Sequence, residues 1–272
     1  MDLNSKDIQL QYQGFLSTPM LWKSDIIFGI KQFELSEVDA TPFNESVPKN
    51  LRLGKRVERY TSHLFKQYKE IKILAENIQI QNNKTTVGEI DCIVKKNEQP
   101  IHIEIVYKFY LYDKTVGSTE LAHWVGPNKN DNLFKKLTKL KEKQLPLLFR
   151  SQTKSLLKKL DLIGSNILQQ VYFKAQLFLP LNLDLNMYTL VNKDCIAGFY
   201  IRYDELQQFK NCKFFIPSKV NWLQEVQTQT SWLNFEHFSN KLEPIIQNKT
   251  SPLCWIKYPN GEVKKFFVVW WD

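Results

Sequence analysis

Two acidic residues, Asp91 and Glu104, stand at matching positions in two neighbouring strand-like segments, 87–94 and 101–108. If these segments form a hairpin that is symmetric about the Asn97–Glu98 junction, paired positions sum to 195, and Asp91 lies directly opposite Glu104. Directly opposed residues of an antiparallel pair have Cβ atoms about 4.5–5.5 Å apart, so two carboxylates there can hold one hard cation. The spacing therefore predicts a metal site on one face of a hairpin.

A lysine shares the strand face of these carboxylates. Alternation of side chains places His102, Glu104, Val106 and Lys108 together on one face. Lys108 lies about 13 Å beyond Glu104 at roughly 3.3 Å per residue, but its flexible arm can lean back toward the carboxylates. A cation and a nearby ammonium could together stabilise a phosphate. The alternative is a set of alternating charges on an exposed sheet.

Residues 53–68, directly before the strands, are expected to form a helix, because their apolar residues recur at helical spacing. Glu58 falls at the flank of its apolar stripe, from which the side chain can approach the sheet. In the alternative interpretation, Glu58 is a solvated glutamate that pairs with Arg59 or Lys55.

A second helix is expected over 131–144, and Gln144 falls on its apolar side. Projection at about 100° per residue groups Gln144 with Leu133, Leu137 and Leu140, and puts Lys135, Lys139 and Lys143 on the opposite side. An inward glutamine needs hydrogen-bond partners. The Asp91–Glu104 face could supply them, or the amide could cap a buried backbone group.

The basic residues of the chain are concentrated in one segment. The formal net charge is +9, and residues 131–160 hold eight lysines and one arginine against two acidic residues, so nine minus two leaves +7 there. Such a surface favours phosphate contacts through counterion release. The candidate nucleic-acid-binding residues are Lys135, Lys136, Lys139, Lys143 and Arg150. A solvated lysine-rich helix is the alternative.

Cysteine, histidine and hydropathy patterns narrow the class of protein. The four cysteines and four histidines are scattered without zinc-ligand spacing, so reduced structural thiols and ordinary polar histidines are expected. No apolar run approaches the roughly 18 residues of a membrane span. The N-terminal residues also lack the basic-then-apolar order of a secretory signal. A cytoplasmic protein without a membrane partner is expected, and the sequence leaves its oligomeric state open.

Three parts of the chain are expected. They are an N-terminal helical or irregular segment (1–50), a core (51–215) and a C-terminal helix plus β-hairpin (216–272) packed on the core. Further strands are expected at 171–179 and 196–202. The hairpin signal is the run Pro259-Asn260-Gly261-Glu262, because Asn-Gly tolerates the positive φ angles of a tight turn. Its tryptophans Trp255, Trp270 and Trp271 could stack on bases, although packing is the expected use.

The expected elements follow the order helix, three strands, helix and strand. They carry, in sequence, Glu58, Gly88-Glu89-Ile90-Asp91, Glu104 and Lys108. This arrangement resembles the PD-(D/E)XK, restriction-endonuclease-like superfamily over residues 50–180. Over most of the chain, the motifs look like those of an uncharacterised, domain-of-unknown-function branch of it. They are Leu53-Gly54-Lys55, Gly88-Glu89-Ile90-Asp91, the run from Glu104 to Leu111, Gly126-Pro127-Asn128 with Asp131, and Gln144-Leu145-Pro146-Leu147. The fold class expected from this resemblance is α/β, with a restriction-endonuclease-like core and additions at both ends.

The resemblance implies hydrolysis of phosphodiester bonds in DNA or RNA, with DNA favoured. Asp91 and Glu104 would ligate Mg²⁺ or Mn²⁺, while Glu58, Gln144 and Lys108 would form the catalytic set, with Lys108 orienting or activating the attacking water. The usual pattern has a lysine two residues after the glutamate, where this chain has Val106. Two other readings therefore stay open, which are a non-catalytic nucleic-acid-binding module and a protein-interaction domain with an aromatic hairpin.

Overall fold

A computed structural model describes residues 3–23, 27–36, 38–181, 183 and 190–272. The chain is a mixed α/β protein with a large mixed sheet, and it divides into two compact units that are both discontinuous in sequence. The central unit comprises Met20–Tyr107 and Lys135–Lys174. The terminal unit comprises Met1–Pro19, Lys108–Phe134 and Ala175–Asp272. None of the described helices is both long and apolar enough to cross a lipid bilayer.

Helix α2 (Leu53–Phe65) is followed by three antiparallel strands, β1 (Ile71–Asn82), β2 (Thr85–Lys96) and β3 (Gln99–Tyr112). They belong to the central unit except for the end of β3 from Lys108 on, which belongs to the terminal unit. Two-residue turns join these strands, and their residues Asn83, Asn97 and Glu98 have positive φ. The expected order of a helix and three strands is confirmed.

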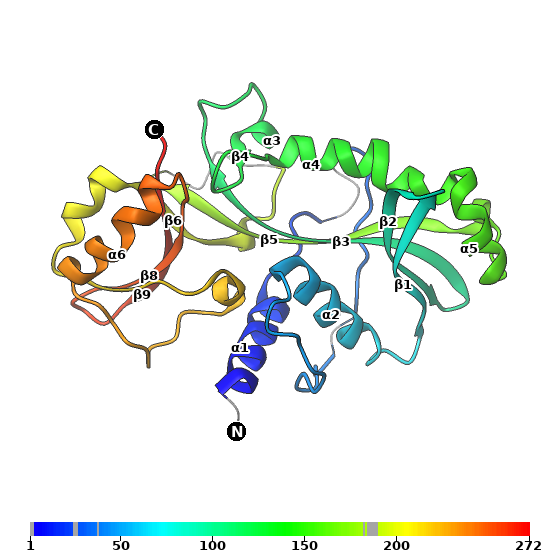
Figure 1. The fold of residues 1–272 in the computed structure, drawn as a ribbon, viewed down its shortest axis with the longest axis horizontal. Coiled ribbons are helices and arrows are strands. Elements are labelled where there is room, and N and C mark those ends of the chain that lie inside the picture. The colour runs from blue at the N-terminus through cyan, green and yellow to red at the C-terminus, as the bar shows by residue number, and fades with distance from the viewer. Residues whose placement is uncertain (1–2, 24–26, 37, 182, 184–189) are drawn as a thin grey trace. The chain divides into compact units, whose positions relative to one another are not determined.

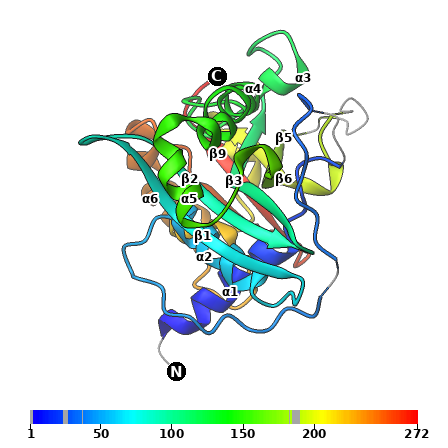
Figure 2. The same ribbon diagram turned by 90° about the vertical axis from the view of Figure 1, so that its right-hand side faces the viewer.

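A run of short helices precedes the next strand, and all of it from Lys135 on belongs to the central unit. It consists of α4 (Leu133–Lys139), the π-helical turn η1 (Leu140–Gln144), the 3₁₀ helices η2 (Leu145–Phe149) and η3 (Ser151–Thr153), α5 (Lys154–Lys159) and η4 (Gly164–Asn166). Strand β5 (Leu168–Pro180) begins in this unit and ends in the terminal one. In Figures 1 and 2, α2 covers one face of β1–β3 and the run from α4 to α5 covers the other.

An apolar cluster holds the α4–α5 run against β1 and β2. Its buried members are Ile80, Ile90, Ile93, Leu147, Leu148, Leu157 and Ile167. Strand β3 is buried along most of its length on both faces. A charged face of an exposed sheet, the alternative for this strand, is therefore excluded.

The terminal unit contains α1 (Leu3–Ser17), α3 (Glu120–His123), β4 (Trp124–Val125), β6 (Ile196–Arg202), β7 (Lys213–Phe215), α6 (Phe235–Gln247), β8 (Leu253–Lys257) and β9 (Val263–Val269), with short 3₁₀ helices at Lys193–Cys195, Tyr203–Phe209 and Lys219–Leu223. The β8–β9 hairpin turns at Gly261, whose φ is +89°, as the Asn-Gly signal predicts. Strand β9 pairs with β6 in parallel, and β8 pairs with β7. The hairpin is thus integrated into a sheet, and its Trp255 is 1% exposed, which makes packing its role.

Candidate functional site

The predicted register of the β2–β3 hairpin is confirmed. The paired residues run from Lys96↔Gln99 to Cys92↔Ile103, and each pair sums to 195. Asp91 and Glu104 occupy the next position of this register, where β2 continues to pair with β1 while its regular pairing with β3 ends. The Asp91 Oδ2 atom accepts the backbone N–H of Ile105 at 2.9 Å. The two carboxylates therefore lie where the strands separate, and one of them satisfies a backbone donor there.

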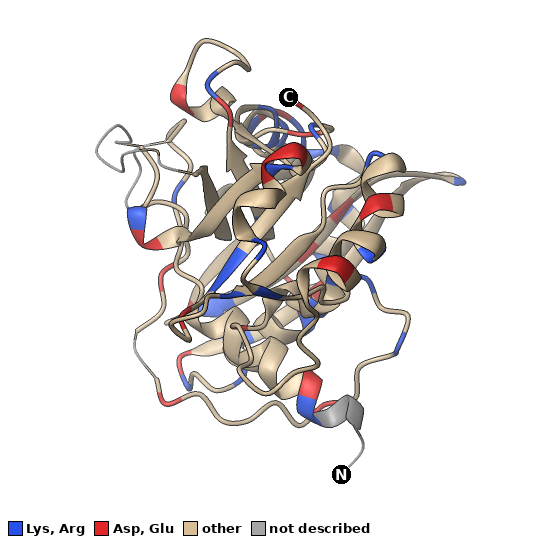
Figure 3. Cartoon of the chain, turned by 90° about the vertical axis from the view of Figure 1, so that its left-hand side faces the viewer, with Lys and Arg blue, Asp and Glu red and all other residues tan. Residues whose placement is uncertain are grey.

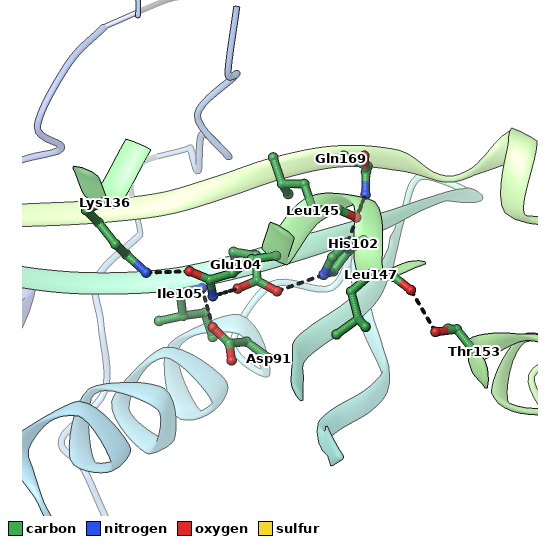
Figure 4. A network of polar contacts seen from close by, with 10 residues as sticks. Asp91, His102, Glu104, Ile105, Lys136, Leu145, Leu147, Thr153 and Gln169 are labelled. Atoms are coloured by element: carbon green, nitrogen blue, oxygen red, sulfur yellow. Dashed lines mark hydrogen bonds and ion pairs between the residues drawn. The ribbon is translucent and has the colours of Figure 1, made fainter. Parts of the chain in front are cut away.

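Glu104 is fully buried, and each of its carboxylate oxygens accepts one side-chain hydrogen bond (Figure 4). Oε1 lies 3.1 Å from Nε2 of His102, and Oε2 accepts from Nε2 of Gln144 at 2.5 Å. These two bonds fix the orientation of the carboxylate. Of the two alternatives for Gln144, the bond to the acidic face is the one that the structure shows.

Neighbouring donors restrict the tautomer of His102. The Gln169 amide nitrogen contacts Nδ1 of His102 at 3.2 Å and also donates to the Leu145 carbonyl oxygen. An amide nitrogen only donates, so Nδ1 must accept and the ring proton must lie on Nε2, facing Glu104. Flipping the Gln169 amide would set its oxygen against the Leu145 carbonyl oxygen. The contacts of Gln169 with His102 and Leu145 thus favour the His102 tautomer whose Nε2–H faces Glu104.

Lys136 is linked to the same carboxylate from helix α4. Its Nζ donates to Oε1 of Gln144 at 2.8 Å, while the nitrogen of that amide bonds Glu104. Lys136 was expected to bind nucleic acid from the surface, but it is only partly exposed and its ammonium is directed at Gln144. The other expected nucleic-acid-binding residues Lys135, Lys139, Lys143 and Arg150 are exposed.

Burial and the charge of Glu104 together raise the pKa of Asp91 to about 8. The bond from the Ile105 N–H and the charge of Lys136 act in the opposite direction, and the charge of Glu58 adds to the rise. At neutral pH and without a bound cation, Asp91 therefore carries a proton. A buried carboxyl in that state is poised to exchange its proton for a cation.

Glu58 reaches this acidic neighbourhood from α2, but it pairs with a lysine of its own helix. Lys55 Nζ lies 2.7 Å from Glu58, 2.5 Å from Glu89 and 3.0 Å from the Asn77 amide oxygen. Burial raises the pKa of Glu58, Lys55 lowers it, and the charges of Glu89 and Glu104 raise it further. The Lys55 pairing given as the alternative is thus observed, although Glu58 is not a solvated residue, since only 14% of its side chain is exposed.

Lys108 belongs to the terminal unit, where its Nζ forms an ion pair with Asp131 at 2.6 Å. Asp131 also ends the Gly126–Asp131 turn through the Gly126 N–H to Asp131 O bond of 2.8 Å. Val106, at the usual lysine position, is buried at 5% exposure. The observed partner gives Lys108 a structural role at this turn, and its predicted catalytic role stays a prediction.

The residues present fit a hard cation with few protein ligands. In the part of the chain that the structure describes, no group of three or more His, Cys, Asp or Glu side chains is arranged to enclose a metal ion. Mg²⁺ commonly uses one or two carboxylates and completes its shell with water and substrate phosphates. Asp91 and Glu104 can supply that pair, and carboxylates that bind metals typically accept hydrogen bonds, as Glu104 does from His102 and Gln144. The four cysteines are free and buried, and among the described residues none of them belongs to a group of three or more candidate metal ligands.

Sequence reasoning missed His102 and Gln169 as parts of the site. His102 stands two residues before Glu104, on the same strand face, and this alternation was the available signal. Gln169 lies 67 residues from His102, and no sequence pattern joins them.

Fold and site define an α/β protein with a buried glutamate, Glu104, and a partly buried aspartate, Asp91, at the point where two antiparallel strands separate. Residues 20–269 match the family model described as domain of unknown function, DUF1853, and the chain belongs to that family. No curated protein and no solved structure matches the chain. Membership of an uncharacterised family is as expected, while the wider restriction-endonuclease-like relationship stays a prediction.

Proposed function

We propose that this protein is a metal-dependent nuclease of the restriction-endonuclease-like type that hydrolyses phosphodiester bonds of DNA or RNA. The observation that carries the proposal is the pairing of the partly buried Asp91 with the fully buried Glu104, in which a carboxyl with a pKa of about 8 adjoins a carboxylate held by His102 and Gln144. Acids with strongly shifted pKa values are costly for folding and are concentrated at functional sites.

In the proposed mechanism, Asp91 and Glu104 would hold Mg²⁺ or Mn²⁺, and the ion would supply charge neutralisation at the phosphate and a more acidic water. His102 and Gln144 fix the orientation of the Glu104 oxygens. A nearby ammonium would stabilise negative charge on the attacking water. We assign it to Lys136, which the Gln144 amide connects to Glu104, and keep Lys108 as the second candidate.

The test is cleavage of labelled single- and double-stranded DNA and RNA with Mg²⁺ or Mn²⁺, comparing wild type with Asp91→Asn. Cleavage that needs the metal and is lost in the variant supports the proposal. The matched control is Asp39→Asn, which removes an exposed aspartate of the same unit and should cleave normally. Equal cleavage by Asp91→Asn and wild type would place the activity elsewhere.

A second candidate is a non-catalytic nucleic-acid-binding module. Val106 in place of the usual lysine and the engagement of Lys108 with Asp131 favour it. Salt-dependent binding without cleavage of any substrate, with either metal, would select this function. For the compartment we propose the cytoplasm, supported by four free, buried cysteines.

A further inference from the structure

Phe149 and Ile163 are exposed apolar residues on the α4–α5 run of the central unit, 56% and 67% exposed. Phe149 ends η2, whose Leu147 and Leu148 are buried in the core, so the helix packs two residues inward and leaves this ring outside. The ring borders Gly164, where an added Cβ would lie 3.8 Å from Phe149 Cδ1. The exposed ring of Phe149 therefore lies beside Gly164, which has no side chain to cover it.

A shallow groove of about 450 Å³ begins at Gly164. Ile163 and Leu157 supply apolar lining, and Lys154, Lys158 and Asp161 supply charged lining. Leu157 belongs to the apolar cluster beneath, so the groove floor is part of the packed core. Its walls are therefore positioned before any ligand arrives.

The surroundings of the groove are basic. Between residues 149 and 164 the chain has Arg150, Lys154, Lys158 and Lys159 against Asp161, so four minus one leaves +3. All four basic side chains are exposed, and none forms an ion pair with a residue that the structure describes. Outside residues 131–160 the net charge of the chain is only +2, since 9 minus 7 leaves 2. Figure 3 shows basic and acidic residues interspersed on the face that it presents.

We propose that this groove binds single-stranded nucleic acid, with a base stacked on Phe149 and the backbone phosphates on Lys154, Lys158 and Arg150. Unpaired bases offer flat apolar faces and the backbone offers regular negative charge, which is the combination that an exposed ring amid ammonium groups recognises. A duplex keeps its base faces stacked inside, so it could use the charges but not the ring. The inference rests on the proposed function for nucleic acid as the substrate, and it adds the single-stranded form.

The test is fluorescence anisotropy of a labelled oligonucleotide, as a single strand and as its duplex, in EDTA so that nothing is cleaved. Wild type is expected to prefer the single strand, and Phe149→Ala to weaken single-strand binding about tenfold with duplex binding unchanged. The control Leu168→Ala removes another exposed apolar side chain of this unit, 50% exposed and outside the groove, and should bind as wild type.

The charged part of the groove is tested with Lys154→Gln/Lys158→Gln. This variant should weaken binding to both forms and reduce the salt slope by about 1.5, at ~0.7–0.9 per lost phosphate contact. Lys72→Gln/Lys84→Gln removes the same charge from exposed sites on the β1–β2 hairpin and should not change the slope.

Equal loss in Phe149→Ala and Leu168→Ala, tighter binding of the duplex, or no nucleic-acid binding at all would overturn the inference. The proposed cleavage function has a separate readout. Metal-dependent cleavage together with single-strand binding that Phe149→Ala leaves unchanged would refute the groove alone, and groove binding without cleavage in Mg²⁺ or Mn²⁺ would refute the nuclease alone.

Discussion

Asp91 and Glu104 differ in their hydrogen-bond partners although they are neighbours. Glu104 accepts from His102 and Gln144, whereas Asp91 accepts one backbone N–H and has a pKa raised to about 8. When two acids share a buried place, one of them holds the proton until a cation replaces it. A proton on Asp91 and a cation between the two acids are therefore competing occupants.

Mn²⁺ binding is expected to weaken about tenfold for each pH unit below about 8, because the cation binds the ionised form and must displace the Asp91 proton. Above that pH the affinity should level off. Titration calorimetry in two buffers with different ionisation enthalpies measures both the affinity and the released proton. Affinity that does not change with pH, or that survives in Asp91→Ala and Glu104→Ala folded variants, would contradict this assignment.

Lys136→Met is expected to lower kcat about 100-fold with little change in substrate affinity, because it removes an ammonium needed mainly in the transition state. Lys136→Arg keeps the charge and should recover part of the rate. The matched variant is Lys108→Met, and steady-state kinetics with circular dichroism separate catalytic from structural effects. If folded Lys108→Met loses more kcat than Lys136→Met, Lys108 rather than Lys136 supplies the ammonium.

At the scale of elements, the site depends on a close approach between β2 and η2. A Cβ at Gly88 would lie 2.6 Å from Leu147 Cδ2, which is buried in the cluster that holds the α4–α5 run on the sheet. Asp91 lies three residues further along β2, and Gln144, which bonds Glu104, immediately precedes η2. The close packing at Gly88 therefore lies beside the elements that carry the site.

Gly88→Ala is expected to destabilise the fold by about 1–3 kcal/mol through overpacking against Leu147. Gly88→Ala/Leu147→Val should recover part of that loss, because the shorter side chain makes room for the methyl group. Urea unfolding measures each change in the free energy of unfolding. Gly54→Ala is the control, since nothing lies within 4 Å of its added Cβ. A neutral Gly88→Ala would show that Leu147 moves away freely and that the approach does not fix the site.

At the scale of the whole molecule, the exposed lysines of the α4–α5 run and the site carboxylates occupy separate places in the central unit. The basic side chains Lys135, Lys139 and Lys143 point to solvent, while the carboxylates lie beneath the helices that carry them. Attraction of a polyanion and cleavage should consequently respond to different substitutions.

Replacing Lys135, Lys139 and Lys143 with glutamine should weaken nucleic-acid binding and lower the salt slope, because fewer counterions are released. Cleavage at saturating substrate should change little. The control with the same loss of charge replaces three exposed lysines that lie in or next to β1, namely Lys69, Lys72 and Lys84. Binding across a salt series compares the two. Equal slopes in both variants would show that only net charge matters.

The sequence alone determined the β2–β3 register, because a two-residue turn at Asn97–Glu98 and strict alternation are local properties. Periodicity likewise predicted the inward direction of Gln144 on its helix. These features depend on contacts between residues near one another in the chain.

The tertiary structure alone decided the partners of these residues. Lys108 bonds Asp131, Lys136 bonds Gln144, and Gln169 restricts His102 across 67 residues. Periodicity places a side chain on a face but does not say which distant element covers that face. The sequence did not predict the π-helical turn η1 or the pairing of β9 with β6. Both are set by packing between segments that are far apart in the chain.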